Sequence, residues 1–479
     1  MTISNLSSTT PAEAYGYNGY RGLFGNLSGT VMNLTLDAPV VSAAYQYVAG
    51  LVAYSNGGTV KNITVKNPSI ASTKFGSTRY GVSAIIGYMT NGTTVENCHV
   101  TGGTISAINP GVGAVAGYLD GTSIKNCTAT NVAISYTSSP TRVGSVVGAV
   151  VNANVTDCHA TGCSITGTYA ATSNYGGIVG YAEDASVSDC TVKNASISVG
   201  AQNVGGIVGQ LKYVDGTNAV TNCFVENSTI TSTSAPVAGV VGYSYGNTSN
   251  MNTIKNCGVI GGSATGHYNV GGIVGNGFQT KVIGCYNHGM AIVATYNGST
   301  TAAGGIAGYN ATCYSCFSSA TVTLSNSTST RFGPIGGDYT TCNYCAYDSD
   351  VYNSTKGYTY KGEAFTTEQV KSGEVTYYLS TQGTTNANAF TAWKQTIGNQ
   401  DYPSLTGKTV YYDAAATPKY FNKVTYTVTV PTATAQGSVS ASNIDAVAGE
   451  VITLTVTPAE NYALTSLTVT DADGNPVAV

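Results

Sequence analysis

Apolar and polar positions follow a four-residue pattern that recurs twelve times: an apolar residue, a spacer, usually Asn or Asp, and then Cys, Leu or Ile. The copies begin at Ile3, Val31, Val60, Val95, Ile124, Val155, Val187, Val220, Ile254, Val282, Cys313 and Cys342. They lie 28 to 35 residues apart, and a fixed period in this range is typical of stacked-repeat proteins. The pattern therefore predicts a solenoid with one coil per repeat.

Two further apolar positions recur in step with the first. The residues Gly-Gly-Ile-Val-Gly occupy 176–180, 205–209 and 271–275, with looser copies in most other repeats, and an apolar residue such as Ile105 or Ile134 follows the Cys position by seven residues. These are short β-branched runs between turn residues, and no repeat has a sustained helical period. Three strands per repeat predict an all-β fold, a right-handed parallel β-helix of 11 to 12 coils with about 30 residues each.

The third position of the four-residue pattern predicts a corner in the chain. Residues three apart on a straight strand point to opposite faces, yet both ends of the pattern are apolar. A left-handed backbone at the third position would turn both ends toward the core, and Asn, Asp and Gly tolerate that conformation best. Ten of the twelve copies carry one of these residues there.

Nine cysteines stand in the last position of the pattern, where the first three repeats have Leu6, Leu34 and Ile63. They are Cys98, Cys127, Cys158, Cys190, Cys223, Cys257, Cys285, Cys316 and Cys345. A buried column of small hydrophobic residues explains them, because side chains that point in parallel do not face each other as a disulfide requires. We predict buried, reduced thiols, with Cys163 as a further packing residue.

Three groups raise the alternative of a metal site. Cys313, Cys316, Cys342 and Cys345 form two Cys-x-x-Cys pairs that would suit zinc, but ladder packing accounts for the same positions. Asp348 and Asp350 are two carboxylates in an expected turn, which is weak evidence for calcium. His99 and His159 are two coils apart, too far to share an ion, and are expected to be solvated. We predict no metal and no cofactor.

The repeats end near Cys345, and the composition then changes twice. Residues 1–345 are the predicted β-helix, and 346–420 are a predicted capping segment with a short capped helix over 366–373. We expect Trp393 to cover the open end of the last coil, since an uncovered end exposes strand edges and apolar side chains. Sugar stacking is the alternative role for Trp393. Residues 421–479 read as alternating β-strands of a small, incomplete module.

The two recurring patterns resemble the GLUG motif of secreted and surface proteins of bacteria, over residues 3 to 345. The patterns Ala448-Gly449-Glu450-Val451 and Asp471-Ala472-Asp473-Gly474-Asn475 resemble a divergent internalin-type B-repeat. The resemblance implies a β-helix stalk or binding surface, of a kind that also occurs in immunoglobulin A-cleaving metallopeptidases, usually without catalysis.

The amino-acid composition argues against several classes of function. Only 9% of the residues are charged and the formal charge is −4, so the chain lacks the basic surface that nucleic acid or an anionic membrane would require. No apolar run approaches a transmembrane helix, and Met1 is not followed by a signal peptide, so we expect the export signal and any anchor to lie outside this sequence. Carboxylates share no column and no His-Glu-x-x-His occurs, which argues against an enzyme.

Tyrosine supplies the candidate binding residues. Six tyrosines stand directly after the second pattern: Tyr54, Tyr88, Tyr118, Tyr181, Tyr243 and Tyr309. Their rings form either an outward stripe for a sugar or protein, or internal packing. We predict a secreted or cell-surface monomer, an adhesin or stalk that contacts a host protein or glycan. The alternatives are a β-helix carbohydrate-active enzyme, either a polysaccharide lyase or a glycosidase, and a structural stalk of a larger surface protease.

Overall fold

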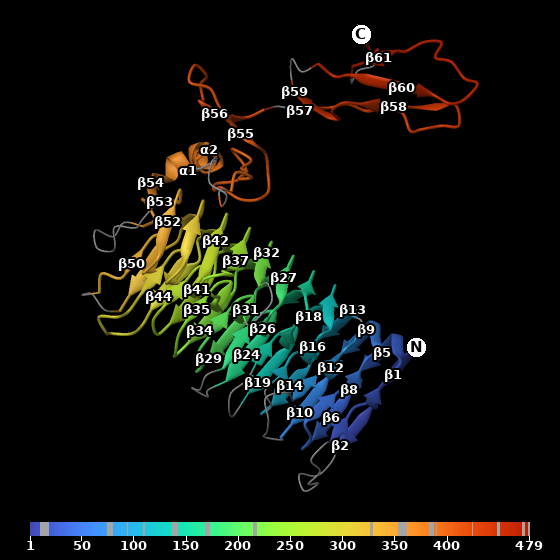
Figure 1. Ribbon diagram of the computed structural model, residues 1–479, viewed down its shortest axis with the longest axis vertical. Helices are drawn as coiled ribbons and strands as arrows, with labels where there is room; N and C mark the ends of the chain where they lie inside the picture. The colour runs from blue at the N-terminus through green and yellow to red at the C-terminus, as the bar shows by residue number, and fades with distance from the viewer. Residues whose placement is uncertain are drawn as a thin grey trace. The chain divides into compact units, whose positions relative to one another are not determined.

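The computed structural model describes residues 1–9, 19–73, 80–92, 94–108, 111–136, 142–167, 173–213, 218–325, 329–352, 362–382, 388, 390–423, 425–447, 451–471 and 475–477. The chain divides into two compact units, Met1–Gly407 and Lys408–Val479. The first unit contains a parallel β-helix whose coils stack from the N terminus toward β53 (Ala346–Asp348) (Figure 1). The prediction of a β-solenoid is confirmed.

Four parallel sheets run along the β-helix. Sheet A has 21 strands, from β1 (Thr2–Ser4) to β54 (Glu363–Phe365). Sheets B and C have 11 strands each, from β2 (Ser7–Thr9) to β49 (Val322–Leu324) and from β3 (Tyr20–Arg21) to β50 (Phe332–Gly333). Sheet D consists of β4 (Phe24–Leu27), β8 (Val52–Asn56), β12 (Ile86–Thr90), β16 (Ala116–Asp120), β21 (Val147–Val151), β26 (Val179–Glu183), β31 (Val208–Lys212), β36 (Val241–Tyr245), β41 (Val274–Phe278), β46 (Ala307–Tyr309) and β51 (Gly336–Asp338).

The prediction of three strands per coil is wrong, because the Gly-Gly-Ile-Val-Gly pattern contains a turn. In one coil, β30 (Val204–Gly205) of sheet C ends and β31 of sheet D begins within the pattern. The closing glycine lets the two sheets approach backbone to backbone: a Cβ on Gly148 would lie 2.3 Å from the backbone nitrogen of Val112 in the preceding coil. The pattern therefore marks the junction of sheets C and D.

The corner prediction is confirmed at all twelve copies. Their third residues have φ between 48° and 59°: Asn5, Asn33, Asn62, Asn97, Asn126, Asp157, Asp189, Asn222, Asn256, Gly284, Ser315 and Tyr344. The side-chain amides also form a ladder. Asn62 donates to Asn33, Asn97 donates to Asn62 and Asn126 donates to Asn97, each at 2.8 Å from Nδ2 to Oδ1. The corners are thus held by side chains as well as by backbone.

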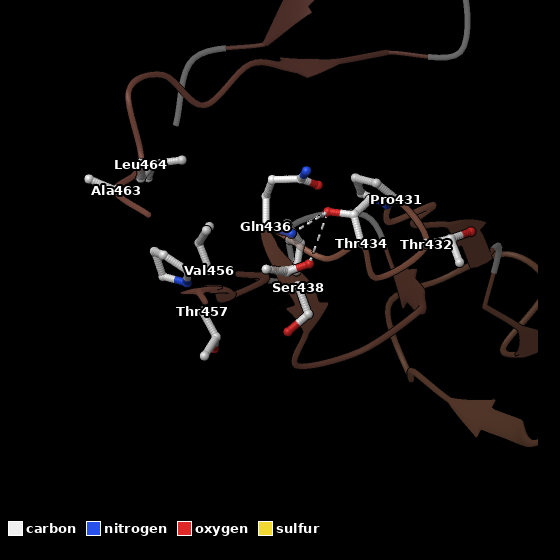
Figure 2. Close-up of a pocket in the computed structure, with 12 residues that line it drawn as sticks. Pro431, Thr432, Thr434, Gln436, Ser438, Val456, Thr457, Ala463 and Leu464 are labelled. Carbon is white, nitrogen blue, oxygen red and sulfur yellow. Dashed lines mark hydrogen bonds between the residues drawn. The ribbon is translucent and has the colours of Figure 1, made fainter. Parts of the chain in front are cut away.

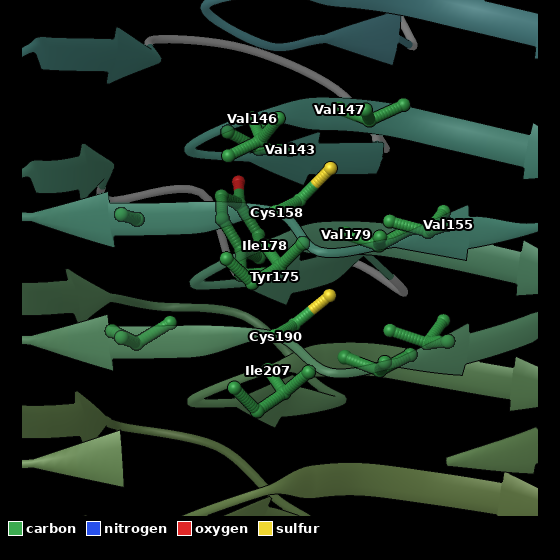
Figure 3. Close-up of a cluster of buried hydrophobic side chains, with 14 of the residues drawn as sticks. Val143, Val146, Val147, Val155, Cys158, Tyr175, Ile178, Val179, Cys190 and Ile207 are labelled. Atoms are coloured by element: carbon green, nitrogen blue, oxygen red, sulfur yellow. The ribbon is translucent and has the colours of Figure 1, made fainter. Parts of the chain in front are cut away.

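The core is one hydrophobic cluster that continues from coil to coil. All nine cysteines of the column are buried and free, and Cys158 and Cys190 point in the same direction in successive coils (Figure 3). Their sulfurs lie near backbone carbonyls, as from Cys158 to the oxygen of Thr156 at 3.4 Å. Burial raises the pKa of the Cys158, Cys223 and Cys316 thiols well above the ordinary value. The predicted burial of the column is confirmed, and Cys163 is buried beside it.

After the last coil, two short helices follow β54. α1 (Thr367–Ser372) begins with a capping box between Thr366 and Gln369 and ends at Gly373, as the sequence predicts. α2 (Glu374–Thr381) buries Val375 and Leu379. Both helices lie beside the last coils (Figure 1).

The expectation that Trp393 covers the open end of the core is wrong. Trp393 belongs to a second hydrophobic cluster, with Leu379 and the outward residues Tyr286, Phe317 and Ala346 of sheet A. Each of these three residues follows a cysteine of the inward column, and neighbours on a strand point to opposite faces. We call the described residues 366–382 and 390–407 the lateral cap, because side chains from both stretches pack on the outer face of sheet A in the last coils. The first unit extends to Gly407, whereas the predicted capping segment extends to residue 420.

The second unit contains four two-stranded antiparallel sheets. Its strands are β55 (Val410–Tyr412) with β56 (Tyr420–Asn422), β57 (Thr425–Thr427) with β59 (Asp445–Val447), β58 (Gly437–Ala441) with β60 (Leu454–Pro458), and β61 (Val469–Thr470) with β62 (Pro476–Val477). The predicted β character is confirmed. The internalin-type resemblance stays a prediction, and residues 448–450 and 472–474 of its patterns lie outside the described residues.

Candidate functional site

The six tyrosines that follow the second pattern stand in one column on sheet D. Paired rungs place Tyr54 beside Tyr88 and Tyr88 beside Tyr118, and Tyr181 and Tyr243 both pair with Gln210 between them. Asn276 then separates Tyr243 from Tyr309. The structure therefore brings the candidate residues into one line along the rod, but their surroundings divide the line in two.

The N-terminal half of the line is a packed aromatic ladder. Tyr88, Tyr118 and Tyr181 are 6%, 3% and 4% exposed. The rings of Tyr54 and Tyr88 stack at 5.7 Å, and those of Tyr88 and Tyr118 at 5.3 Å. Tyr47 of sheet C joins them, and burial together with the neighbouring hydroxyls raises its pKa to about 12. This half stabilises the outer face of the rod.

Charged groups close the ladder at Tyr181. The guanidinium of Arg142 lies 4.1 Å from the centre of the Tyr181 ring, and the Tyr181 hydroxyl donates to Glu183. Burial and that contact raise the pKa of Tyr181. Although burial opposes it, the Tyr181 hydroxyl and the Lys212 ammonium, 3.0 Å away, lower the pKa of Glu183. Within sheet D the Glu183 and Lys212 charges offset each other, and Arg142 of sheet C adds a cation beside the Tyr181 ring.

The C-terminal half of the line is open to solvent. Tyr243 and Tyr309 are half-buried, and next to them Tyr245 and Phe278 are 42% and 37% exposed. The Tyr245 and Phe278 rings stack at 5.3 Å with 16° between their planes. This pair is not among the binding residues predicted from the sequence. The signal was available, because Tyr245 stands two residues after Tyr243, and alternate residues of a strand share a face.

Trp393, the remaining candidate, is 2% exposed. Its ring meets Phe390 at 5.7 Å and Tyr286 at 6.3 Å, both edge to face. Its indole nitrogen has no hydrogen-bond partner among the described residues. The structure places Trp393 inside the lateral cap, away from any surface on which a sugar could stack.

A cavity of about 360 Å³ lies between the lateral cap and the coils. His288, Asp348, Lys371 and Asp401 are among its lining residues. The His288 ring stacks on Tyr402 with ring centres 3.6 Å apart, and burial lowers the pKa of His288, so its imidazole is neutral at pH 7. The lining residues therefore include both hydrogen-bond donors and hydrogen-bond acceptors.

Within this cavity Asp348 has a structural part. The Thr367 hydroxyl donates to both of its carboxylate oxygens at 3.0 and 2.9 Å, and the backbone nitrogens of Asp350 and Val351 donate to one of them. The carboxylate of Asp350 accepts from the backbone nitrogen of Thr367 at 2.8 Å. The predicted turn at 348–350 thus fixes the start of α1. Over the described ranges, no group of three or more His, Cys, Asp or Glu side chains is arranged to hold a metal ion.

Histidines on sheet A repeat one contact. Nδ1 of His99, His159 and His288 lies 2.8 to 2.9 Å from the hydroxyl of Thr128, Thr191 and Ser319 of the next coil. Because the contact recurs away from the cavity, it is a packing feature of stacked coils. His99 and His159 are partly exposed, as expected.

The second unit has a small groove of about 230 Å³. Pro431, Val456, Ala463 and Leu464 contribute to its largely apolar lining (Figure 2). In the part of the chain that is described, no helix is long and apolar enough to cross a membrane.

Sequence and structure comparisons agree with this architecture. The GLUG motif matches residues 108–135, 139–166 and 171–198, so the chain is a β-solenoid that contains at least three GLUG motif repeats. No curated protein matches the sequence at a significant level.

Two solved structures show a distant likeness. One, named "putative immunoglobulin A1 protease from Bacteroides ovatus", has a TM-score of 0.37 and 17% identity over 57% of this chain and 85% of that chain. The catalytic domain of a GH87 α-1,3-glucanase, solved with tetrasaccharides, has a TM-score of 0.30 and 14% identity over 71% of this chain and 64% of that chain. Similarity at this level carries no statement about the activity of this chain.

Proposed function

We propose that the protein is a non-catalytic β-helix of the bacterial cell surface that contacts a host protein or glycan as an adhesin or contact stalk. The observation that carries the proposal is the exposed aromatic surface of sheet D around Tyr245 and Phe278. Aromatic side chains that remain exposed on a rigid sheet are typical of recognition surfaces. We expect the protein to act as a secreted or surface-attached monomer.

The charged residues support recognition without strong electrostatics. Pairs across adjacent coils neutralise one another, as in Lys61 with Glu96 at 2.9 Å and Lys193 with Glu226 at 2.9 Å. Such exposed pairs contribute little to stability. Their arrangement leaves hydroxyl, amide and aromatic groups as the main contact chemistry, which fits an uncharged partner.

A carbohydrate-active enzyme is the second candidate, and the cavity at the lateral cap favours it. Two carboxylates there, Asp348 and Asp401, lie close enough to influence His288. Hydrolysis of a glycosidic bond needs a proton donor and a second carboxylate on opposite sides of the bond. Asp348 is already committed to Thr367 and the following turn, so we rank this candidate below recognition.

A glycan and mucin array, run beside a reducing-sugar assay on the same panel, separates the candidates. Recognition predicts binding that Tyr245→Ala and Phe278→Ala weaken and Asp401→Asn leaves unchanged, with no sugar released. Sugar release that Asp401→Asn abolishes would establish the enzyme instead. Absence of both binding and release would favour the third candidate, a structural stalk of a larger surface protease.

A further inference from the structure

The exposed half of the sheet D line alternates aromatic and amide residues. Gln210, Tyr243, Asn276 and Tyr309 are directly paired rungs of β31, β36, β41 and β46. All four are half-buried, so each presents one side to solvent while its base is fixed by neighbours. No such alternation occurs between Tyr54 and Tyr118, where consecutive rungs are tyrosines packed on one another.

A second column stands beside the first, two residues along each strand. It contains Lys212, Tyr245 and Phe278. The Tyr243 and Tyr245 ring centres are 6.1 Å apart and the ring planes are inclined by 63°, so ring surfaces of different orientation border the amide positions. Asn276 is half-buried, and its side-chain oxygen is covered by neighbouring atoms without a hydrogen-bond partner among the described residues. The surface therefore combines apolar ring faces with the half-buried amide side chains of Gln210 and Asn276, of which the Asn276 oxygen is covered.

This combination matches the chemistry of an uncharged sugar. The C–H face of a pyranose packs on an aromatic ring, and the accessible group of an amide side chain forms a hydrogen bond with a sugar hydroxyl. Burial raises the pKa of Tyr243 and Tyr309, so both phenols stay neutral hydrogen-bonding groups at physiological pH. Lys212 is paired with Glu183 at 3.0 Å, which removes the cation that a polyanionic chain would need.

The spacing of the two tyrosines along the rod indicates how a bound polysaccharide would lie. Tyr243 and Tyr309 are two coils apart, about 10 Å at the usual strand separation, with Asn276 midway. Two linked, extended sugar rings have a comparable length. We propose that Gln210, Tyr243, Asn276 and Tyr309 bind an uncharged, extended polysaccharide that lies along the rod axis, with one sugar ring per coil. This inference rests on the proposed function and names its ligand class.

Titration calorimetry of the full chain with cello- and chito-oligosaccharides of two to six rings tests the length relation. Four rungs span about 14 Å at that separation, so affinity should rise from two to four rings and then level off. Tyr243→Ala and Tyr309→Ala should each lower the affinity of the four-ring probe about tenfold, corresponding to about 1.4 kcal/mol per ring contact. Asn276→Ala should lower it by a similar factor.

Tyr344→Asn is the matched control. Tyr344 is 38% exposed, but it stands at a sheet A corner where most other repeats have Asn or Asp, so the variant removes an exposed ring without disturbing the coil. Its affinity should equal that of the parent. Thermal unfolding of every variant must remain within a few degrees of the parent for a loss of affinity to count.

Four outcomes would overturn the inference. Affinity that does not depend on chain length, or that survives in the Tyr243→Ala/Tyr309→Ala double variant, would place any sugar elsewhere. Binding only of sulfated polysaccharides, or of polysaccharides that contain uronic acids, would show that the site recognises negative charge. Binding of a mucin polypeptide or host protein that Tyr245→Ala removes, with no affinity for the oligosaccharides, would refute the polysaccharide and leave the proposed contact surface intact.

Discussion

Replacing Cys158 by Asp tests whether water reaches the buried cysteine column. Cys158 is fully buried between Cys127 and Cys190. An unpaired carboxylate there would be protonated in the folded state, whereas in the unfolded chain it ionises with a pKa of about 3.9. At pH 7 the difference spans three pH units at about 1.4 kcal/mol each, so folding loses about 4 kcal/mol. Cys158→Ala, which only removes a small group, should lose about 1 kcal/mol.

The pH dependence makes this prediction specific. The folded-state pKa of the new carboxyl is raised above its unfolded value, so the native state holds the extra proton. The ionisation penalty is therefore absent below about pH 4 and grows as pH rises toward 7. Urea unfolding of both variants at pH 4, 5.5 and 7 measures it. A difference between Asp and Ala that is the same at all three pH values would refute the reasoning, because it would mean that water reaches the column.

Three further changes address the corners, the lateral cap and the ladder. Asn126→Ala should cost about 1–2 kcal/mol by urea unfolding, because Asn126 has φ of 50° and Ala resists that conformation, and Asn126→Gly should recover most of the loss. Equal stability of the two variants would contradict this. Trp393→Ala should cost about 3–5 kcal/mol and expose Tyr286 and Phe317, so light scattering should detect association; a stable monomer would argue against a covering role. Tyr47 has its pKa raised to about 12, so its contribution to stability is complete below pH 10 and is lost as pH rises through 12. Tyr47→Phe should move the alkaline unfolding midpoint, followed by circular dichroism, to higher pH, and an unchanged midpoint would refute the link.

The repeat period, the corners and the inward column were predictable because each follows from the order of residues along the chain. Asn97 is followed by Cys98 in a pattern that makes sense only with a left-handed turn. The C–D junction was not predictable, because it depends on the distance between backbones of successive coils, as at Gly148. The position of Trp393 was not predictable either, since the segment after the last coil could cover either the open end or the side of the rod. The sequence shows that Phe317 is large and follows a cysteine, but not that a distant segment covers it.

The exposure of each tyrosine could not be predicted from the sequence either. Tyr118 and Tyr243 stand at the same position of their repeats, yet one is buried and the other partly open. The difference comes from neighbours in adjacent coils, such as Tyr88 and Arg142 for Tyr118. A period read along the chain identifies the column, whereas the exposure of each member depends on packing between coils.

The corner ladder also has a direction. Every amide described in it donates toward the N-terminal coil, and Asn222 and Asn256 continue this direction by donating to Asp189 and Asn222 at 3.0 and 3.2 Å. An ionised Asp carboxylate accepts hydrogen bonds but donates none. Asp189 therefore donates no hydrogen bond to Asp157, and Asp157 donates none to Asn126. When coils are peeled off under mechanical load, a corner with an amide bond resists more than one without. The corners at Asp157 and Asp189 therefore lack this support, as do the last three corners, at Gly284, Ser315 and Tyr344. The stretched rod should open first in these coils, and the coils joined by amide bonds from Asn33 to Asn126 and from Asp189 to Asn256 should resist longest.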